Sequence, residues 1–355
     1  MKKNADKNFQ TEKVGDLEVC YYDALKPPFE LEGFPWRDPA LIFNRLPASF
    51  TEKDVYAGML CHARRTAGGA IRFRADSPHL TLRTVLVNSA DMNHMPRAAS
   101  AGFDFYGGAG KDIKYRKTVQ PDRDQKNLET LLIGGQAGQM TDWTLYLPLY
   151  GAASKIEIGI ACGSKPEKPT PHAVSRPVLF YGSSITQGGC ASRSGNAYTT
   201  MLCRAVDAPQ INLGFSSSGT GDPAVAEAIA GLDLAAFVMD YDHNAPSPEH
   251  LENTHEKFFK IIRGKNSGLP VIIMSKCDFL GSKEDKDRRE VIRRTYTNAV
   301  RGGDKNVWFI DGETLFGLED RDACTVDGCH PNDLGFYRMF RTILPTLEKA
   351  LQGQK

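Results

Sequence analysis

The spacing of apolar residues changes about halfway along this chain of 355 residues. Between residues 37 and 162 the apolar runs are short and alternate with other residues, and glycine-rich turns such as 107–110 separate them. A period of two is typical of strands that bury one face. We therefore expect an antiparallel β-sandwich here, jelly-roll-like in arrangement. Its predicted strands are 40–46, 70–75, 80–87, 128–133, 143–149 and 155–160.

A polar stretch rich in proline follows the last of these runs. Pro166, Pro169 and Pro171 lie among lysine, glutamate and threonine, a composition typical of an extended, semi-rigid spacer. The sequence thus predicts two domains joined by a linker. They are a β-sandwich domain over 1–163, with residues 1–36 wrapped around it, a linker over 164–177 and a second domain over 178–355.

In the second domain the pattern becomes strand, loop and helix, repeated. One amphipathic helix is expected over about 251–262, after the start signal Ser247-Pro248. The last helix is expected to begin near Asn332, and Pro345 to kink or end it. This alternation predicts a doubly wound α/β domain, with a parallel five-stranded sheet of flavodoxin-like order and helices on both faces. The predicted strands are 178–181, 210–213, 235–241, 270–275 and 307–310.

Composition narrows the range of partners. Lys and Arg number 44 against 43 Asp and Glu, so the net charge is +1 and no basic tail is present. We therefore expect neither a nucleic-acid nor a membrane partner. No apolar run approaches the ~20 residues that span a bilayer, and no apolar segment follows the basic start, which predicts a cytoplasmic protein. The eight cysteines have no disulfide-framework spacing.

The first strand of the second domain is followed by candidate chemistry. It ends in a glycine and two serines, the second of which is Ser184, so it would deliver a hydroxyl to the carboxyl edge of the sheet. Asp327 and His330 precede the last predicted helix and should lie at the same edge. His330 would then take the proton of Ser184, and Asp327 would orient the imidazole. Imidazoles ordinarily titrate near neutral pH, which suits a general base.

An acyl-transfer site also needs donors for the developing oxyanion. Gly214 ends the second predicted strand, and without a side chain its backbone N–H can approach a substrate closely. Asn244 follows the third predicted strand and offers an amide N–H. Taken singly, Gly214 is better explained as a turn glycine and Asn244 as the cap of its own loop.

These residues together resemble the four blocks of the SGNH (GDSL-like) hydrolases, in order, and the resemblance extends over 178–351. It implies a serine esterase with Ser184, His330 and Asp327 as catalytic triad, without metal or cofactor. It also implies three oxyanion donors, the backbones of Ser184 and Gly214 and the side chain of Asn244. The N-terminal part resembles the β-sandwich companion domain of one branch of this family. The matching segments there are Trp36-Arg37-Asp38-Pro39, Arg45-Leu46-Pro47, Gly68-Gly69, Arg72-Phe73-Arg74, His94-Met95-Pro96, Gly102-Phe103-Asp104-Phe105-Tyr106 and 145–150.

Two positions depart from the family pattern. Ser183 stands where the family has the Asp of Gly-Asp-Ser, which makes Ser183 a rival nucleophile. The third block reads Asp242-His243-Asn244-Ala245, which keeps the asparagine but changes its neighbours. A substrate assignment therefore cannot be taken over from the lipase-like branches.

Other readings compete for some of these segments. Gly219-Thr220-Gly221 fits a dinucleotide-binding turn, but it trails its strand and belongs to the second βα unit. Asp240, Asp242 and His243 could hold a metal ion, although ester hydrolysis needs none. A catalytically inactive glycan-binding protein is a further alternative, because sandwiches host such sites. His94 and Arg37 of the sandwich are not expected to line the active site.

The sequence therefore predicts a serine esterase that forms an acyl-enzyme on Ser184. The acyl group is expected to be short, such as acetyl, because no long apolar lid or helical insertion is present to shelter a fatty chain. The expected substrate is an ester of a small polar alcohol or an oligosaccharide. Capture of the same acyl-enzyme by an alcohol instead of water would make the protein an acyltransferase.

Overall fold

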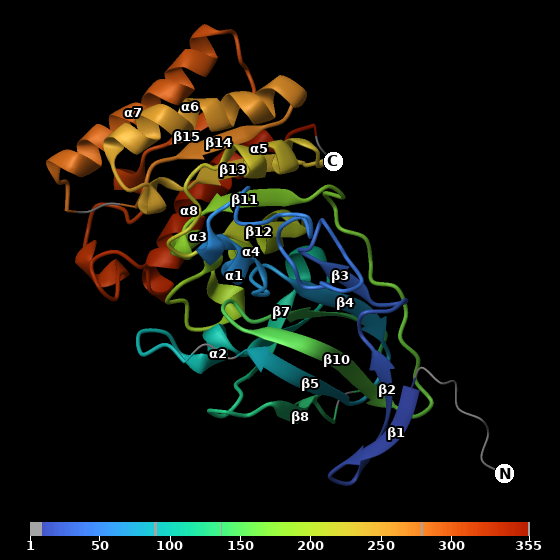
Figure 1. The fold of residues 1–355 in the computed structure, drawn as a ribbon. Coiled ribbons are helices and arrows are strands. Elements are labelled where there is room, and N and C mark those ends of the chain that lie inside the picture. The colour runs from blue at the N-terminus through green and yellow to red at the C-terminus, as the bar shows by residue number, and fades with distance from the viewer. Residues whose placement is uncertain (1–8, 89–90, 136, 278–279, 354–355) are drawn as a thin grey trace.

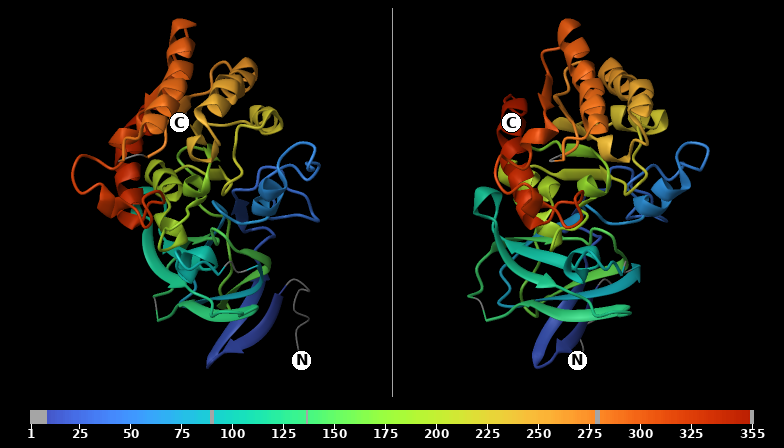
Figure 2. Two further views of the ribbon diagram at one scale, coloured as in Figure 1. Left: turned by 60° about the vertical axis from the view of Figure 1, so that its left-hand side comes forward. Right: turned by 90° about the vertical axis from the view of Figure 1, so that its left-hand side faces the viewer.

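The structure is a computed structural model that describes residues 9–88, 91–135, 137–277 and 280–353. The chain folds into two parts, a sandwich of two antiparallel sheets and a parallel sheet flanked by helices (Figure 1). The first described strand, β1, lies at the far side of the sandwich, and the last helix, α8, lies in the helical part. In both views of Figure 2 the segment around α1 (Ala57–Ala63) lies beside the helical part.

Large side chains from both sheets fill the interior of the sandwich. The ring of Trp143, which is 1% exposed, stacks on Phe105 with ring centroids 5.1 Å apart. The sheets have the strand orders β1-β2-β10-β5-β8 and β3-β4-β9-β6-β7. The strands are β1 (Phe9–Val14), β2 (Leu17–Asp23), β3 (Glu30–Glu32), β4 (Ala70–Ala75), β5 (Leu80–Asn88), β6 (Phe103–Gly107), β7 (Lys114–Val119), β8 (Asn127–Ile133), β9 (Thr141–Tyr146) and β10 (Ala152–Ala161).

Several sandwich predictions need correction. Four predicted strands correspond to β4, β5, β8 and β10, and the prediction at 143–149 overlaps β9. The predicted strand at 40–46 is wrong, because this segment forms turns that bridge the two parts. Ile42 packs against the core of the sandwich and Leu46 against the core of the helical part. Residues 1–36 do more than wrap, since β1, β2 and β3 belong to the two sheets.

The C-terminal part has the predicted doubly wound arrangement. Its strand order β12-β11-β13-β14-β15 is flavodoxin-like, and all its strand pairs are parallel. The order reverses between β11 and β13, and such a switch point opens a crevice at the carboxyl ends of the strands. The strands are β11 (Val178–Gly182), β12 (Gln210–Gly214), β13 (Ala236–Asp240), β14 (Val271–Met274) and β15 (Val307–Ile310).

Helices cover both faces of this sheet. Successive residues of a strand point to opposite faces, so Phe180 packs with α4 and α8 while Tyr181 packs with α5, α6 and α7. The helices are α1, α2 (Arg97–Ser100), α3 (Ser184–Gln187), α4 (Tyr198–Val206), α5 (Pro223–Ala230), α6 (Pro248–Lys265), α7 (Lys283–Arg301) and α8 (Asp333–Ala350). Short 3-10 helices are η1 (Gly110–Asp112), η2 (Ser194–Asn196), η3 (Asp242–Asn244), η4 (Gly312–Thr314) and η5 (Asp322–Cys324).

The last helix continues past its proline. α8 begins after the predicted cap Asn332, but Pro345 does not end it, and the helix runs on to Ala350. Pro345 lies on the exposed side, where water can reach the backbone carbonyl left without a partner. Ile343 and Leu347 on either side are fully buried, and their packing keeps the helix intact.

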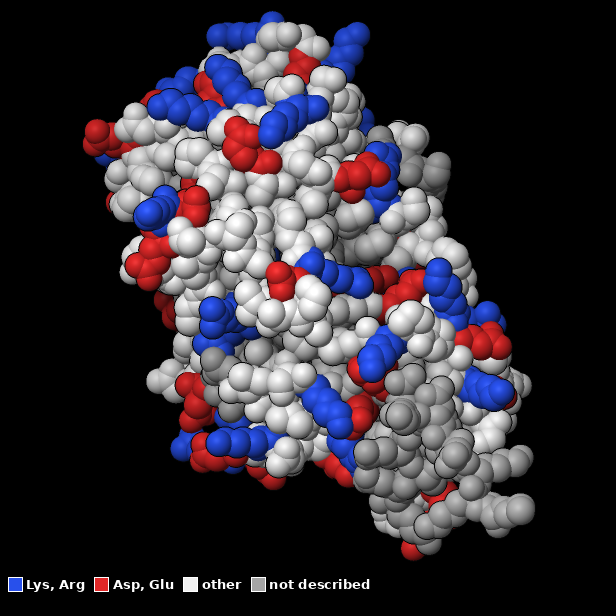
Figure 3. All heavy atoms as spheres, turned by 45° about the vertical axis from the view of Figure 1, so that its right-hand side comes forward, with Lys and Arg blue, Asp and Glu red and all other residues white. Residues whose placement is uncertain are grey.

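Charged side chains are mixed on the surface. On the face shown in Figure 3, basic and acidic groups lie next to one another and form no extended field of one sign. This mixture agrees with the net charge of +1. Within the described ranges, no helix has both the length and the apolar character needed to cross a membrane.

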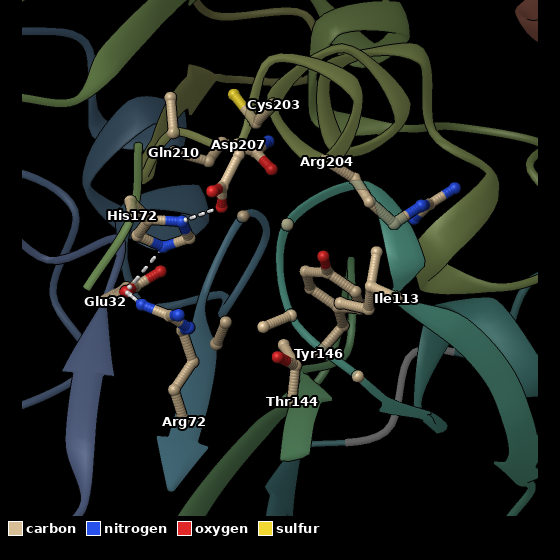
Figure 4. Close-up of a pocket in the computed structure, with 16 residues that line it drawn as sticks. Glu32, Arg72, Ile113, Thr144, Tyr146, His172, Cys203, Arg204, Asp207 and Gln210 are labelled. Carbon is tan, nitrogen blue, oxygen red and sulfur yellow. Dashed lines mark hydrogen bonds and ion pairs between the residues drawn. The ribbon is translucent and has the colours of Figure 1, made fainter. Parts of the chain in front are cut away.

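A half-buried ionic cluster joins the linker to both parts of the molecule. His172 in the linker lies between two carboxylates, with Nδ1 2.7 Å from Asp207 Oδ1 and Nε2 3.0 Å from Glu32 Oε1 (Figure 4). Glu32 on β3 also pairs with Arg72 on β4, at 3.0 Å. Asp207 follows α4, so the cluster connects the sandwich to the helical part through the linker imidazole.

The two carboxylates change the charge state of the imidazole. Burial alone would lower the pKa of His172, but hydrogen bonds with Asp207 and Glu32 outweigh it, and the pKa is raised. A histidine pKa that is raised in the folded state stabilises the protein fully below its unfolded value of about 6.5, and this stabilisation is lost as pH rises through the folded value.

We therefore expect His172→Gln to lower Tm more at pH 6 than at pH 9. At pH 6 the wild type gains from the charged imidazole, whereas at pH 9 it has lost much of that gain, which the variant never had. Thermal unfolding of the two proteins at both pH values measures the gap, which is the Tm of the wild type minus that of the variant. His79→Gln, a change to a histidine outside this cluster, is the control. An equal gap for His172→Gln would contradict the prediction.

Candidate active site

A tight turn after β11 places two serines at the carboxyl edge of the sheet. Gly182 ends the strand where no side chain fits, since a Cβ there would lie 2.1 Å from Thr186 Oγ1 and 2.3 Å from the carbonyl oxygen of Asp240. The chain therefore passes directly from strand into helix. Ser183 caps α3, and Ser184 is the first residue of that helix.

The two serine hydroxyls have different surroundings. Ser183 is fully buried, and its Oγ accepts a hydrogen bond of 3.1 Å from the backbone N–H of Ile185. Ser184 is partly exposed, and its Oγ lies 2.9 Å from His330 Nε2. The geometry therefore favours Ser184 over its rival Ser183 as candidate nucleophile.

The loop before α8 holds an acid and a histidine in a fixed relation. Asp327 Oδ1 accepts hydrogen bonds from the backbone N–H groups of Cys329, at 3.0 Å, and His330, at 2.7 Å. Asp327 Oδ2 lies 2.8 Å from His330 Nδ1. Gly328 between them has φ +84°, a left-handed conformation that glycine adopts without strain. One short loop thus supplies both groups in contact.

The carboxylate determines which imidazole nitrogen carries the hydrogen. An ionised Asp327 can only accept, so Nδ1 of His330 donates to it and Nε2 is left to accept the Ser184 hydroxyl hydrogen. Burial alone would raise the pKa of Asp327, but hydrogen bonds from the backbone and side chain of His330 outweigh it and hold the pKa below its ordinary value. The acid is therefore ionised at neutral pH, as the orienting role requires.

A second carboxylate ties the two loops together. Asp333, at the start of α8, accepts hydrogen bonds of 2.8 Å from the backbone N–H of Ser192 and from Asn196 Nδ2. Ser192 and Asn196 lie in the segment that leads from α3 to α4. The serine loop and the histidine loop are thus cross-linked beside their point of contact.

Gly214 does not have the predicted role. Its backbone N–H already donates to Asn212 Oδ1 at 2.8 Å, so the prediction of an oxyanion donor at this position is wrong. The glycine is required for packing instead, because a Cβ there would lie 2.2 Å from the backbone nitrogen of Gln187 in α3. The sequence showed only a glycine at a strand end. That pattern does not distinguish a glycine needed as an oxyanion donor from one needed for close packing.

The loop after β12 and Asn244 offer other donors. Asn244 Nδ2 donates one hydrogen to the carbonyl of Phe215 at 2.8 Å, which leaves its second hydrogen. Ser217 in this loop has φ +55°, and no acceptor for its backbone N–H is found among the described residues. The same holds for the backbone N–H of Ser184. Sequence reasoning missed Ser217, because a serine gives no signal of positive φ.

A buried arginine of the N-terminal part supports this loop from behind. Arg45 is 0% exposed, and its guanidinium donates to the carbonyls of Asn212, at 2.9 Å, and Gly214, at 2.8 Å. It also donates to the carbonyls of His62 and Arg65. Burial lowers the pKa of Arg45 to about 9, which leaves it charged at neutral pH.

Residues that follow β9 reach the nucleophile helix. The Tyr150 hydroxyl donates to the carbonyl of Ser184 at 3.3 Å. Gln187 at the end of α3 donates from Nε2 to the carbonyl of Leu149, at 3.1 Å, and accepts at Oε1 from the backbone N–H of Ser216, at 3.0 Å. The sandwich therefore contributes directly to the position of the candidate nucleophile, Ser184.

One sandwich residue lies in the site against expectation. The ring of His94 stands 6.2 Å from that of His330, measured between centroids, so His94 does line the site. Arg37, as expected, does not. It lines a groove with Pro177 and Pro209, at the amino ends of β11 and β12.

The acidic residues near the end of β13 serve neighbouring groups. Asp240 Oδ2 accepts hydrogen bonds from the hydroxyls of Tyr198, at 2.7 Å, and Thr186, at 3.0 Å, and burial raises its pKa to about 7. Asp242 accepts from a backbone N–H, and the ring of His243 lies between two cysteine sulfurs. In the described part of the chain, no His, Cys, Asp and Glu side chains form a group suited to a metal ion.

The glycines of the dinucleotide-like segment pack tightly against neighbouring strands. A Cβ at Gly219 would lie 2.3 Å from the carbonyl oxygen of Gly182, and one at Gly221 would lie 2.6 Å from the Tyr241 hydroxyl. α5 begins only at Pro223, so the glycine turn does not lead straight from β12 into a helix. Both glycines thus have a packing reason within this fold.

Two family models match the sequence. Residues 175–348 match the GDSL-like lipase/acylhydrolase family, and residues 19–165 match the N-terminal domain of SGNH-hydrolase-type esterases. The chain belongs to the GDSL-like, SGNH-type acylhydrolase family. A comparison with curated proteins found no significant match to this chain.

Solved structures agree with this assignment. The acylhydrolase fold is similar to that of a GDSL-like lipase from Bacteroides ovatus, with 28% identity, a TM-score of 0.84, and coverage of 94% of this chain and 98% of that one. The salicylyl-acyltransferase SsfX3 of a tetracycline biosynthetic pathway has 20% identity, a TM-score of 0.77 and the same coverage. An acetyl xylan esterase from Butyrivibrio proteoclasticus has 13% identity, a TM-score of 0.60, and coverage of 94% and 99%. The last two likenesses show the fold alone.

We expect Gly214→Ala to destabilise the acylhydrolase and to reduce its activity. The added Cβ would overlap the backbone of α3, and overpacking of this kind typically costs about 1–3 kcal/mol. Denaturant unfolding measures the free energy of unfolding, and the rate of ester hydrolysis shows how far displacement of α3 reduces activity.

Gly264→Ala is the matched control for this change. A Cβ at Gly264, in α6, would meet nothing within 4 Å, and alanine is the better helix former. Its stability should therefore stay equal or rise. If Gly214→Ala were as stable and as active as Gly264→Ala, the packing account of Gly214 would be contradicted.

Proposed function

We propose that this acylhydrolase is a serine esterase that forms an acyl-enzyme on Ser184. The observation that carries the proposal is the pair of hydrogen bonds that join Ser184 Oγ to His330 Nε2, at 2.9 Å, and His330 Nδ1 to Asp327 Oδ2, at 2.8 Å. A hydroxyl, an imidazole and a carboxylate in this order make a nucleophile, its base and the group that orients the base.

Acylation begins with the attack of Ser184 Oγ on the ester carbonyl. His330 Nε2 takes the hydroxyl proton, and the resulting cation is stabilised by the ionised Asp327. As the tetrahedral intermediate collapses, the same nitrogen gives the proton to the leaving alcohol. Water then enters, loses a proton to His330 Nε2 and attacks the acyl carbon. As this second tetrahedral intermediate collapses, the bond between the acyl carbon and Ser184 Oγ breaks, His330 returns the proton to Oγ, and the acid is released.

We propose three donors for the negative charge on the carbonyl oxygen. They are the backbone N–H of Ser184, the free amide hydrogen of Asn244 and the backbone N–H of Ser217, which replaces Gly214. The hydrogen bond from Asn244 to the carbonyl of Phe215 supports this set, because it fixes the Ser217 loop beside the asparagine. Losing one such donor typically costs about 10²–10³ in rate.

We propose a short acyl group, in particular acetyl, on a carbohydrate or other polar alcohol. Similar folds include the acetyl xylan esterase and a family two carbohydrate esterase from Clostridium thermocellum seen with cellohexaose. These names support a carbohydrate ester as the class of substrate. The acyltransferase fold of SsfX3 supports a second candidate, in which an alcohol captures the same acyl-enzyme.

We expect Ser184→Ala to lose at least about 10⁴-fold in kcat for acetate release, because the nucleophile itself is removed. Ser183→Ala should remain within about tenfold of the wild type, since Ser183 acts as a helix cap, a role worth about 0.5–2 kcal/mol of stability. Initial rates with an aryl acetate and with acetylated xylo-oligosaccharides measure both variants. The reverse order of effects would assign the nucleophile to Ser183. Equal rates for Ser184→Ala and wild type would refute an acyl-enzyme on Ser184.

A further inference from the structure

A short segment of the sandwich crosses onto the catalytic part at His94. Met95 is 3% exposed and belongs to the apolar core beneath one face of the parallel sheet, and the partly buried Met92 packs against the same core. His94 lies between these two anchors and is exposed. The anchors therefore present its imidazole at the surface of the other part of the molecule.

The sandwich holds the same segment from the opposite side. Arg97, directly after it, donates from Nε to the carbonyl of Pro121, at 3.2 Å, and from Nη2 to that of Asp122, at 2.6 Å. The α2 carbonyls of Ala99 and Ser100 accept the backbone N–H groups of Leu149 and Tyr150, in the segment between β9 and β10. The position of His94 is thus determined by contacts on both sides of the domain junction.

The imidazole of His94 stands next to the catalytic base. The two rings have centroids 6.2 Å apart and are inclined at 48°, so they neither stack nor exchange a hydrogen bond. His94 Nδ1 lies 3.2 Å from the side-chain oxygen of Asn93, which leaves Nε2 for another partner. Rings at this separation lie side by side within contact range, so His94 flanks the base at the exposed rim of the site.

We propose that His94 forms a subsite for the leaving alcohol and that this subsite recognises the hydroxyl groups of a sugar. The inference rests on the proposed esterase function and deepens it. His330 Nε2 must reach both Ser184 Oγ and the leaving oxygen, so the alcohol lies on the side of His330. The acyl oxygen lies on the other side, toward Asn244 and Ser217. The second ring nitrogen of His94 can form one hydrogen bond to a hydroxyl group, and the imidazole also offers an apolar face, which suits a sugar ring.

The test compares His94→Ala and His94→Gln on two esters. 4-Nitrophenyl acetate has a flat leaving group without hydroxyls, whereas an acetylated xylo-oligosaccharide has a polar leaving alcohol. For the sugar ester we expect His94→Ala to raise KM about three- to tenfold, the effect of one lost hydrogen bond, with kcat nearly unchanged. For the aryl acetate, kcat/KM should stay within about twofold of wild type. His94→Gln should recover part of the loss, because its amide can still form a hydrogen bond.

His79→Ala, a change to a histidine on a different edge of the sandwich, is the matched control. It should leave KM and kcat unchanged for both esters. The subsite is overturned if both esters lose activity equally, which would indicate an effect on His330, or if neither is affected. In these two cases the wild type still hydrolyses esters, and the proposed function stands. If the wild type hydrolyses no ester, the proposed function fails, and the subsite fails with it.

Discussion

The buried guanidinium of Arg45 is the contact on which the active site most depends. Among the residues that the structure describes it has no carboxylate partner, and it donates instead to two carbonyls at the end of β12 and to two of the N-terminal segment. A buried charge is tolerated only where its hydrogen-bonding groups are satisfied. The strand end from which the Ser217 loop emerges is therefore held to the segment that precedes strand β4 of the sandwich, and neither can move without leaving the charge unpaired.

The sandwich is consequently a structural component of the active site. The Tyr150 hydroxyl donates to the carbonyl of Ser184, and the carbonyl of Leu149 accepts from the side chain of Gln187, so α3 rests on the sandwich segment between β9 and β10. The linker strengthens the same junction at the opposite edge of the parallel sheet, through the imidazole of His172 between its two carboxylates. The two parts are joined by polar contacts that are largely removed from water, where such contacts are most effective.

The sequence predicted the features that depend on residues close together along the chain. The buried parallel strands, their helices and the meeting of Ser184 with His330 follow from periodicity and from the common edge of a doubly wound sheet. The failures concern contacts between distant segments. Residues 40–46 alternate like a strand but bridge two cores, and Gly214 is required by a helix that the sequence does not place beside it. His94 lies in the site because two methionines anchor its loop on the other domain, a fact that only tertiary structure contains.

The most direct test of the central claim is covalent labelling of the nucleophile. A fluorophosphonate reacts with a serine hydroxyl only where a base has activated it. After treatment of the full-length protein, fragmentation of the peptide that contains both serines distinguishes the two positions. We predict an adduct on Ser184, formed together with loss of esterase activity. An adduct on Ser183 alone, or ester hydrolysis that continues without any adduct on this peptide, would contradict the account.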